Sequence, residues 1–392
     1  MADTQLLAEG QHGLVAHSHG GDVPVQTRSE RIRSTNVADF APISRREEQW
    51  KYTTSDQLAG LDADALEEYA GDIELKAGAS ATGSWVGADH ASFGAAGTPE
   101  DRVSAAAWSS AKQAYLVSVA ASDDHQVTRL VLSSSSHEPS ALHLIIDAAA
   151  NANHTVVIDH HGDAVLAENV EIIAGTGAHV TVVALQRWNA GSVHSASHFS
   201  LVGRDAHLKH IVISVGGDVV RVTPNAGFSG PGASVELLGM YFAKAGQHLE
   251  HRLFVDHSEP KCKSRVTYKG ALQGDKAHTI WVGDVLIRAA AEGTDTYELN
   301  RNLLLTDGAR ADSVPNLEIE TGEIQGAGHA SASGRFDDEQ LFYLQARGIS
   351  EIEARRLVVR GFLNEIVQQI GVEDLQEELT NAIEVELERS SN

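Results

Sequence analysis

The chain has 392 residues, of which 42% are hydrophobic, so it is long enough to bury a sizeable core in two or three domains. Its 30 basic and 54 acidic residues give a net charge of −24, which would repel a phosphate backbone or an anionic membrane, so neither nucleic acid nor membrane is an expected partner. The single cysteine, Cys262, excludes an intramolecular disulfide framework, and the N-terminal sequence lacks the apolar core of a secretory signal, which predicts a cytoplasmic protein.

The first part of the chain divides into two segments that differ in composition. Residues 1–40 are polar, with glycine and histidine scattered through GQHGLVAHSHGGD, and we expect a flexible arm there. Residues 41–124 are mixed, and we interpret them as a small, partly helical α/β domain. Four apolar residues of this segment recur at roughly helical spacing, which predicts a helix: Leu58, Leu61, Leu66 and Tyr69.

Residues 125–335 are rich in valine, isoleucine and threonine in short runs that alternate with period two, such as HTVVID and HLKHIVISV, which is typical of strands. A G-x-x-A motif recurs within them, usually just before a strand: Gly175/Ala178, Gly203/Ala206, Gly230/Ala233, Gly274/Ala277 and Gly308/Ala311. A glycine with positive φ and an alanine small enough for an inward corner suit a solenoid of stacked coils. The pattern predicts a mainly β protein with a parallel β-helix core, and a β-sandwich is the alternative.

Residues 336–392 are expected to form a helical domain. The segment DDEQLFYLQARG begins with acids and ends with Arg-Gly, which complements a helix dipole and stops the helix. Ser350 and Glu353 then form a capping box for a second helix. Its apolar residues fall at four-residue steps, namely Val358, Phe362 and Ile366. A third, acidic helix is predicted over residues 374–388.

Several enzyme signatures can be tested against the sequence and do not fit it. The segment GALQGDK resembles a phosphate-binding loop but has Asp275 where that motif requires lysine, and no H-E-x-x-H occurs. In the segment IDHHGD, Asp159, His161 and Asp163 would share one face of a strand and could bind a metal ion. A polar strand face that simply points to water is the favoured interpretation of that segment.

Cys262 is one candidate for metal chemistry because it lies between Lys261 and Lys263. Two ammonium groups would lower the pKa of the thiol and favour the thiolate if the loop is open, and the alternative is a small residue without a role. An iron–sulfur cluster usually requires about four thiolates or equivalent ligands. One cysteine could therefore hold a cluster only with ligands from another chain.

Several long strings of the sequence resemble one known family. They are RNLLLTDGARADSVPNLEIE (301–320), DDEQLFYLQARGI (337–349), GFLNEI (361–366), SRVTYKG (264–270) and, more loosely, REEQWKYT (46–53). These segments are similar to the SufB/SufD family of the SUF iron–sulfur assembly machinery, and the LEIE string is typical of its SufD branch. The resemblance implies a right-handed parallel β-helix core and a C-terminal helical domain, which agrees with the solenoid predicted from the repeats.

The same resemblance implies a role for His329. Many SufD-type sequences have Cys-x-His-Gly-Ala at this place, whereas this chain has Ala327, Gly328, His329, Ala330 and Ser331, so the cysteine is absent. His329 would then act alone, as a ligand or relay for a nascent cluster at the interface with SufB, because a neutral imidazole is a competent iron ligand. A histidine that merely fills an interface is the alternative.

The resemblance further implies partners rather than an enzymatic activity of the chain itself. We expect a heterodimer with a SufB-like subunit and docking of a SufC-like ATPase on the C-terminal helices. The candidate contacts there are Phe342, Leu357, Phe362 and Ile366. The iron–sulfur cluster would be transient and shared with SufB, none would stay on the isolated chain, and ATP would bind only SufC. The alternatives are a β-helix carbohydrate-active enzyme and an assembly adaptor without metal contact.

Overall fold

A computed structural model describes residues 31–335 and 338–389 of the chain. The predicted flexible arm falls mostly on residues 1–30, outside the described residues. Residues 31–392 group into one compact unit, and the finer domain boundaries expected at residues 41, 125 and 336 stay predictions. The chain is mainly β, with 49% of it in strands and few helices. Within residues 31–335 and 338–389, no helix combines the length and the apolar character needed to span a bilayer.

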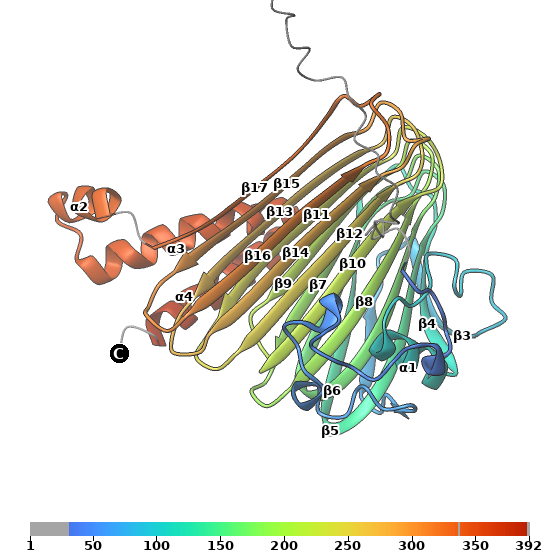
Figure 1. The fold of residues 1–392 in the computed structure, drawn as a ribbon, viewed down its shortest axis with the longest axis horizontal. Coiled ribbons are helices and arrows are strands. Elements are labelled where there is room, and N and C mark those ends of the chain that lie inside the picture. The colour runs from blue at the N-terminus through green and yellow to red at the C-terminus, as the bar shows by residue number, and fades with distance from the viewer. Residues whose placement is uncertain (1–30, 336–337, 390–392) are drawn as a thin grey trace, which may run out of the picture. The chain divides into compact units, whose positions relative to one another are not determined.

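The strands form two parallel ladders (Figure 1). Ladder I contains the first halves of β5 (Gln126–Ala148) and β6 (Asn153–Ala174), then β7 (His179–Trp188), β9 (His207–Ser214), β11 (Ser234–Ala243), β13 (Lys263–Leu272), β15 (Asp295–Leu304) and β17 (Gly326–Gly334). Ladder II contains the second halves of β5 and β6, then β8 (Val193–Val202), β10 (Val219–Phe228), β12 (His248–His257), β14 (His278–Ile287) and β16 (Arg310–Ile319). The chain alternates between the ladders and makes a parallel β-solenoid of about 8 turns, so the predicted β-helix is confirmed and the sandwich is wrong.

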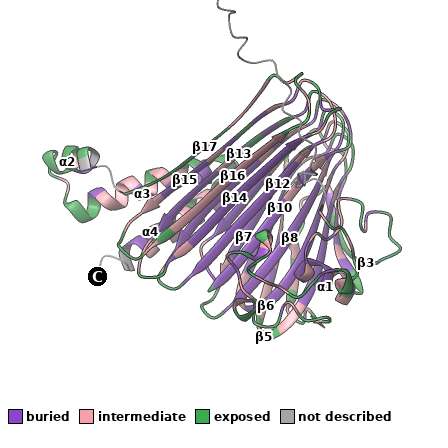
Figure 2. Cartoon of the chain, viewed as in Figure 1, coloured by how far each residue is buried: buried purple, intermediate pink, exposed green. Residues whose placement is uncertain are grey.

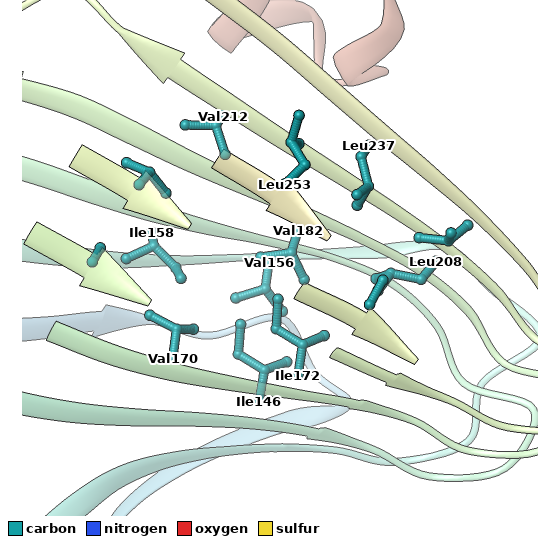
Figure 3. Close-up of a cluster of buried hydrophobic side chains, with 14 of the residues drawn as sticks. Ile146, Val156, Ile158, Val170, Ile172, Val182, Leu208, Val212, Leu237 and Leu253 are labelled. Carbon is teal, nitrogen blue, oxygen red and sulfur yellow. The ribbon is translucent and has the colours of Figure 1, made fainter. Parts of the chain in front are cut away.

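The main core lies between the two ladders. Successive side chains of a strand point to opposite faces, so every second residue points inward. On β6 these include Val156 and Ile158 from ladder I and Val170 and Ile172 from ladder II, all fully buried. Figure 3 shows these side chains meeting inside the solenoid with others from neighbouring coils. Since both faces of most strands are covered, the strands contain long apolar runs with few exposed positions.

The repeated G-x-x-A motif forms the corner between coils, but the predicted reason for its glycine is only partly right. Ala178 is fully buried in the main core, as the inward corner requires. The positive φ falls on Gly177 (68°), two residues after Gly175. Gly175 is required for space, because a Cβ atom there would lie 2.6 Å from the backbone nitrogen of Ala150 on the preceding coil. Only later in the chain, at Gly274 (94°) and Gly308 (82°), does the motif glycine itself adopt positive φ.

Helices cover the outside of both ladders. Helices α3 (Glu351–Val367) and α4 (Glu373–Arg389) pack against the outer face of ladder I, and α1 (Arg102–Ser110) packs against ladder II (Figure 1). One half of the predicted capping box is confirmed, because the Ser350 side chain accepts a hydrogen bond from the backbone N–H of Glu353. Helix α2 (Asp338–Ala346) precedes α3. The buried stripe of α3 is shifted from the predicted one, since it contains Val359 and Leu363 as well as Ile366.

Short elements of the N-terminal region flank the first coil. Within residues 31–124 they include the 3-10 turns Val37–Asp39, Glu48–Trp50 and Ser55–Leu58 and the strands β1 (Glu67–Glu68), β2 (Asp72–Lys76), β3 (Ala81–Gly87) and β4 (Gln113–Val119). The helix predicted from Leu58 to Tyr69 is wrong. Ala59 and Gly60 both have positive φ and end the 3-10 turn at once. Leu58 and Leu61 are still buried against the outside of ladder II. Their three-residue spacing therefore comes from a buried turn and not from a helix.

Candidate functional site

The last coil of the solenoid has open strand edges. Among the described residues, β17 pairs only with β15, and β16 pairs only with β14. Each of the two final strands therefore has one edge whose backbone groups are not used by a ladder. Their side chains are also less covered than those of earlier strands, because β16 is mostly half-buried and β17 is half-buried to exposed (Figure 2). Unpaired edges of this kind are a template for another strand.

His329 lies on β17 at this open end. It is in register with Glu298 of β15, whose side chain points into the solenoid, so His329 occupies an inward-facing position. It is nevertheless exposed, because no further coil of the described chain covers it. Its neighbours along the strand are glycine, alanine and serine, which leave the approach to the imidazole open. The structure thus places the predicted residue at an accessible edge.

The inside of the last coils contains a network of polar side chains. Asn300 and Asn302 of β15 are buried and point inward. The Tyr241 hydroxyl donates a hydrogen bond to Oδ1 of Asn302 over 2.7 Å, and Nδ2 of Asn300 donates to that hydroxyl over 2.9 Å. Nδ2 of Asn302 also reaches Oγ of Ser333 on β17, at 3.1 Å. This network ties the exposed strand to the interior of the solenoid and fixes the position of β17.

The carboxyl group of Glu298, which lies next to His329, has the most unusual environment in the last coils. Its side chain is 1% exposed, and neither carboxyl oxygen has a hydrogen-bond partner in the structure. Burial raises its pKa to about 8, because the carboxylate loses hydration without gaining a cation. The group is therefore a neutral acid at pH 7. Sequence reasoning missed it, although the alternation in YELNRN places Glu298, Asn300 and Asn302 on one face of the strand.

Cys262 does not have the predicted reactivity. The expectation of a low thiol pKa depended on an open loop, whereas the residue is fully buried in the main core. Burial raises the pKa of the thiol to about 11, and the adjacent lysines do not offset it. Lys261 adopts positive φ, 60°, at the turn. The structure therefore gives no support to Cys262 as a thiolate ligand.

The four candidate contacts on the C-terminal helices differ in exposure. Phe342 on α2 is 73% exposed, and Leu357 on α3 is half-buried. Phe362 is partly covered, with the ammonium of Lys269 4.8 Å from the centre of its ring. Ile366 is 2% exposed against ladder I, so its side chain is part of the core rather than a contact surface in this conformation. The exposed Tyr343 and Ile352 were not predicted.

The polar segment IDHHGD does not form the metal site considered from its spacing. Asp159 points outward from β6 under α4, where its carboxylate accepts hydrogen bonds from Arg129 and Arg187. Burial disfavours this carboxylate, but hydrogen bonds from His161 and from the two guanidinium groups hold its pKa well below its usual range. Both guanidinium groups also pair with Glu378 of α4. The segment therefore anchors a helix to the sheet and does not simply face water.

Fold and site together define a parallel β-solenoid protein whose terminal coil is open and polar and whose C-terminal helices cover ladder I. Comparison with known proteins places it more narrowly. Residues 131–362 match the family model of the SUF system FeS cluster assembly, SufBD core domain. An iron–sulfur cluster assembly SufBD family protein of Mycobacterium leprae is 48% identical over 378 residues, which cover 94% of this chain and 96% of the relative.

Two further relatives extend the comparison. A SufBD family protein of Mycobacterium tuberculosis is 49% identical over 372 residues, which cover 92% of this chain and 93% of the relative. The iron–sulfur cluster assembly protein SufD of Escherichia coli is 27% identical over 208 residues, which cover 53% of this chain and 49% of that protein. The chain therefore belongs to the SufB/SufD family of iron–sulfur cluster assembly proteins, as its sequence strings predict.

Proposed function

We propose that the chain is a SufD-type scaffold subunit that has no enzymatic activity of its own. In this proposal its open coil pairs with a SufB-like subunit, and its C-terminal helices dock a SufC-like ATPase that alone binds ATP. The iron–sulfur cluster is cargo that the two scaffold subunits share while it is built. The observation that supports the proposal most strongly is the position of His329, an exposed imidazole at an inward-facing site on an unpaired strand edge.

The open strand edges support the pairing step. The unpaired edges of β16 and β17 offer backbone donors and acceptors to strands of a second solenoid. Inward-facing side chains of the last coil would then be covered, including Ile319, which is 46% exposed. A partner of the same fold would continue both ladders at once. Pairing of this kind would bring His329 into the interior of a joined structure, where Glu298 is already buried.

His329 would serve the cluster through the lone pair of its neutral imidazole. A complete ligand set needs more groups than this chain offers there, since the described last coil contributes no thiol and Cys262 is buried elsewhere. The other ligands would come from the partner. Accordingly, the isolated chain is expected to hold no stable iron–sulfur cluster at the last coil after anaerobic reconstitution.

The test uses the complex of this chain with its SufB-like and SufC-like partners. His329→Ala and His329→Gln are each expected to reduce cluster build-up, followed by visible absorbance, at least tenfold, because neither replacement supplies an imidazole nitrogen. Gel filtration should show an intact complex for both. His179→Ala is the matched control, since His179 is also an exposed strand histidine but lies on β7, and it should assemble clusters normally.

Each outcome decides between two roles for the residue. If both His329 variants assemble clusters at the wild-type rate in an intact complex, the chain is an adaptor and the proposed ligand or relay role fails. If only the alanine variant is impaired, the residue fills space rather than binding iron. Loss of the complex in both variants would make His329 an interface residue and would also overturn the proposed role.

A further inference from the structure

A second group of histidines lies inside the solenoid, away from the open coil. His160 projects inward from the ladder I half of β6, while Glu168 on the ladder II half of β6 and His194 on β8 project inward from the opposite side. All three side chains are at most 1% exposed. They belong to early coils, and β6 and β8 lie at the other end of the solenoid from β17 (Figure 1). The cluster is therefore independent of the proposed site at His329.

The three side chains have the spacing of metal ligands. Nε2 of His160 lies 3.2 Å from each carboxylate oxygen of Glu168, and Nε2 of His194 lies 3.3 Å from Oε2 of Glu168. One ligand atom from each residue falls within 4.8 Å of the others. Metal–ligand bonds of about 2.0–2.1 Å in a tetrahedral zinc site put neighbouring ligand atoms roughly 3.3–3.5 Å apart. The two contacts to Glu168 are close to that separation.

The hydrogen bonds behind the two rings fix their orientation and tautomers. Nδ1 of His160 lies 2.9 Å from the backbone oxygen of Leu185, which can only accept. Nδ1 of His194 lies 2.7 Å from Oε1 of Gln186, and the indole N–H of Trp188 donates to that same oxygen over 3.2 Å. Both Nδ1 atoms are therefore N–H donors. In the neutral rings both Nε2 atoms then carry lone pairs that face Glu168, as in histidine metal sites with an oxygen partner behind each ring.

With both rings neutral, this arrangement has no positive charge unless a cation is bound. Two lone pairs and a carboxylate repel one another in a buried, low-dielectric site. A proton on His160 would satisfy one contact to Glu168. Nε2 of His194 would still lack a hydrogen bond, because this buried atom has no partner of hydrogen-bond geometry in the structure. A divalent cation between the three groups would satisfy all of them at once.

We propose that His160, Glu168 and His194 bind a divalent first-row transition metal ion of the zinc or ferrous class. Two imidazoles and one carboxylate are a ligand set that proteins use for both ions, with a fourth position left for water. Buried Nε2 atoms of Gln186 and His198, on the neighbouring inward positions, also lack hydrogen-bond partners. The ion is a resident of the folded core, and it joins the two ladders at the start of the solenoid.

Because the ligands are fully buried, the ion enters while the chain folds. The full-length protein should therefore be produced in media supplemented with zinc, ferrous iron or cobalt, purified in the presence of EDTA, and analysed for metal by mass spectrometry. Every protein in the comparison should contain His12→Ala, His17→Ala and His19→Ala, so that the histidines of the N-terminal segment do not bind metal. The wild-type core is expected to retain about one equivalent per chain, as structural sites do.

Three variants test the ligand set. His194→Ala and the nearly isosteric Glu168→Gln should each reduce the retained metal at least tenfold. His251→Ala is the matched control, because His251 is an equally buried inward-facing histidine, on β12, that bonds Oγ of Ser214 instead. It should retain the metal. In the cobalt form, the visible absorption of a four-coordinate His/carboxylate site should appear in wild type and His251→Ala but not in the ligand variants.

The proposal can fail in clear ways. Chelator-resistant metal in none of the three media would overturn it, as would equal retention by wild type, His194→Ala and Glu168→Gln. If the variants do not fold, the thermal midpoint of wild type decides the question. The zinc or iron form should unfold at a higher temperature than the protein made with metal depleted, and equal midpoints would refute the site. Cluster assembly by the partner complex plays no part in these measurements.

Discussion

Glu298 is the residue whose chemistry depends most on its place in the fold. It is an ordinary glutamate in sequence, yet in the last coil it is buried without a hydrogen-bond partner, and its pKa rises to about 8. The folded chain therefore holds a proton that the unfolded chain releases near pH 4.5. The stability that this proton supplies is fully present below about pH 4.5 and is lost as the pH rises to about 8.

A prediction at the residue scale follows from the direction in which stability changes with pH. Glu298→Gln should remove a fall in stability on the order of 1 kcal/mol per pH unit between pH 5 and pH 8, because the amide cannot ionise. Denaturant midpoints of wild type and variant at several pH values measure the difference, in which titration of other groups cancels. The variant should be the more stable protein at pH 8. Parallel pH profiles for the two proteins would show that Glu298 is ionised in the folded state.

At the same scale, two adjacent histidines point to opposite faces of one strand. His160 and His161 follow each other in IDHHGD, and the period of a strand places His161 with Asp159 on a possible metal face. The structure turns that face outward, where Arg187 and Arg129 occupy the carboxylate of Asp159. His160 points inward instead and meets Glu168. The spacing within one strand was informative, but it could not indicate which face would meet a second strand.

At the scale of elements, the C-terminal helices combine a packed face with an exposed one. Helices α3 and α4 bury Val359, Leu363 and Ile383 against the outside of ladder I. Helix α2 keeps Phe342 and Tyr343 largely exposed, at 73% and 57%. Large exposed aromatic side chains of this kind are typical of a docking surface. The proposed ATPase contact is therefore better placed on α2 than on the buried stripe of α3.

The element-scale prediction separates these two faces. Phe342→Asp should weaken binding of the SufC-like ATPase at least tenfold, as loss of an aromatic anchor does, without changing thermal stability. Val385→Asp on α4 is the matched control, because Val385 is also an exposed apolar helix residue, at 45%, and should bind normally. Calorimetric titration measures the affinity. Unchanged binding by the Phe342 variant would remove α2 from the proposed interface.

At the scale of the whole molecule, the solenoid is asymmetric along its axis. Its first coil is flanked by added strands, since β2 pairs antiparallel with β5 and β4 pairs parallel with β5. Its last described coil has no such cover on β16 and β17. Edges left open in this way invite pairing, and proteins usually block them when pairing is harmful. The covered end and the open end therefore predict different behaviour toward a partner solenoid.

A pair of lysine substitutions tests this asymmetry. Ile319→Lys places a charge among the inward positions of the open coil and should reduce association with the SufB-like subunit at least tenfold, because a buried unpaired charge is costly. Val127→Lys changes a residue on β5, near the covered end, that is 38% exposed, and should leave association intact. Analytical ultracentrifugation of the mixed subunits measures both. Equal association of both variants with the partner would place the interface elsewhere on the molecule.

Much of the architecture was determined by the sequence itself. The period-two alternation and the G-x-x-A corners predicted stacked coils, because each coil must bury an inward stripe against the next and can turn only where a small residue fits. The helix caps at Ser350 and Gly348 were equally local, since a serine hydroxyl and a residue with positive φ act within one turn of the chain. The strings shared with the SufB/SufD family also placed His329 at a site of interest.

Only the tertiary structure decided properties that depend on residues distant in sequence. The low thiol pKa predicted for Cys262 failed because burial, and not the neighbouring lysines, dominates its environment. The neutral acid at Glu298 and the meeting of His160 with His194 arise from contacts between neighbouring coils. Residues that are in register on neighbouring coils lie 25 or more positions apart in the sequence. Hydration and charge at a point in space depend on everything packed around it, whereas a sequence pattern records only the neighbours along the chain.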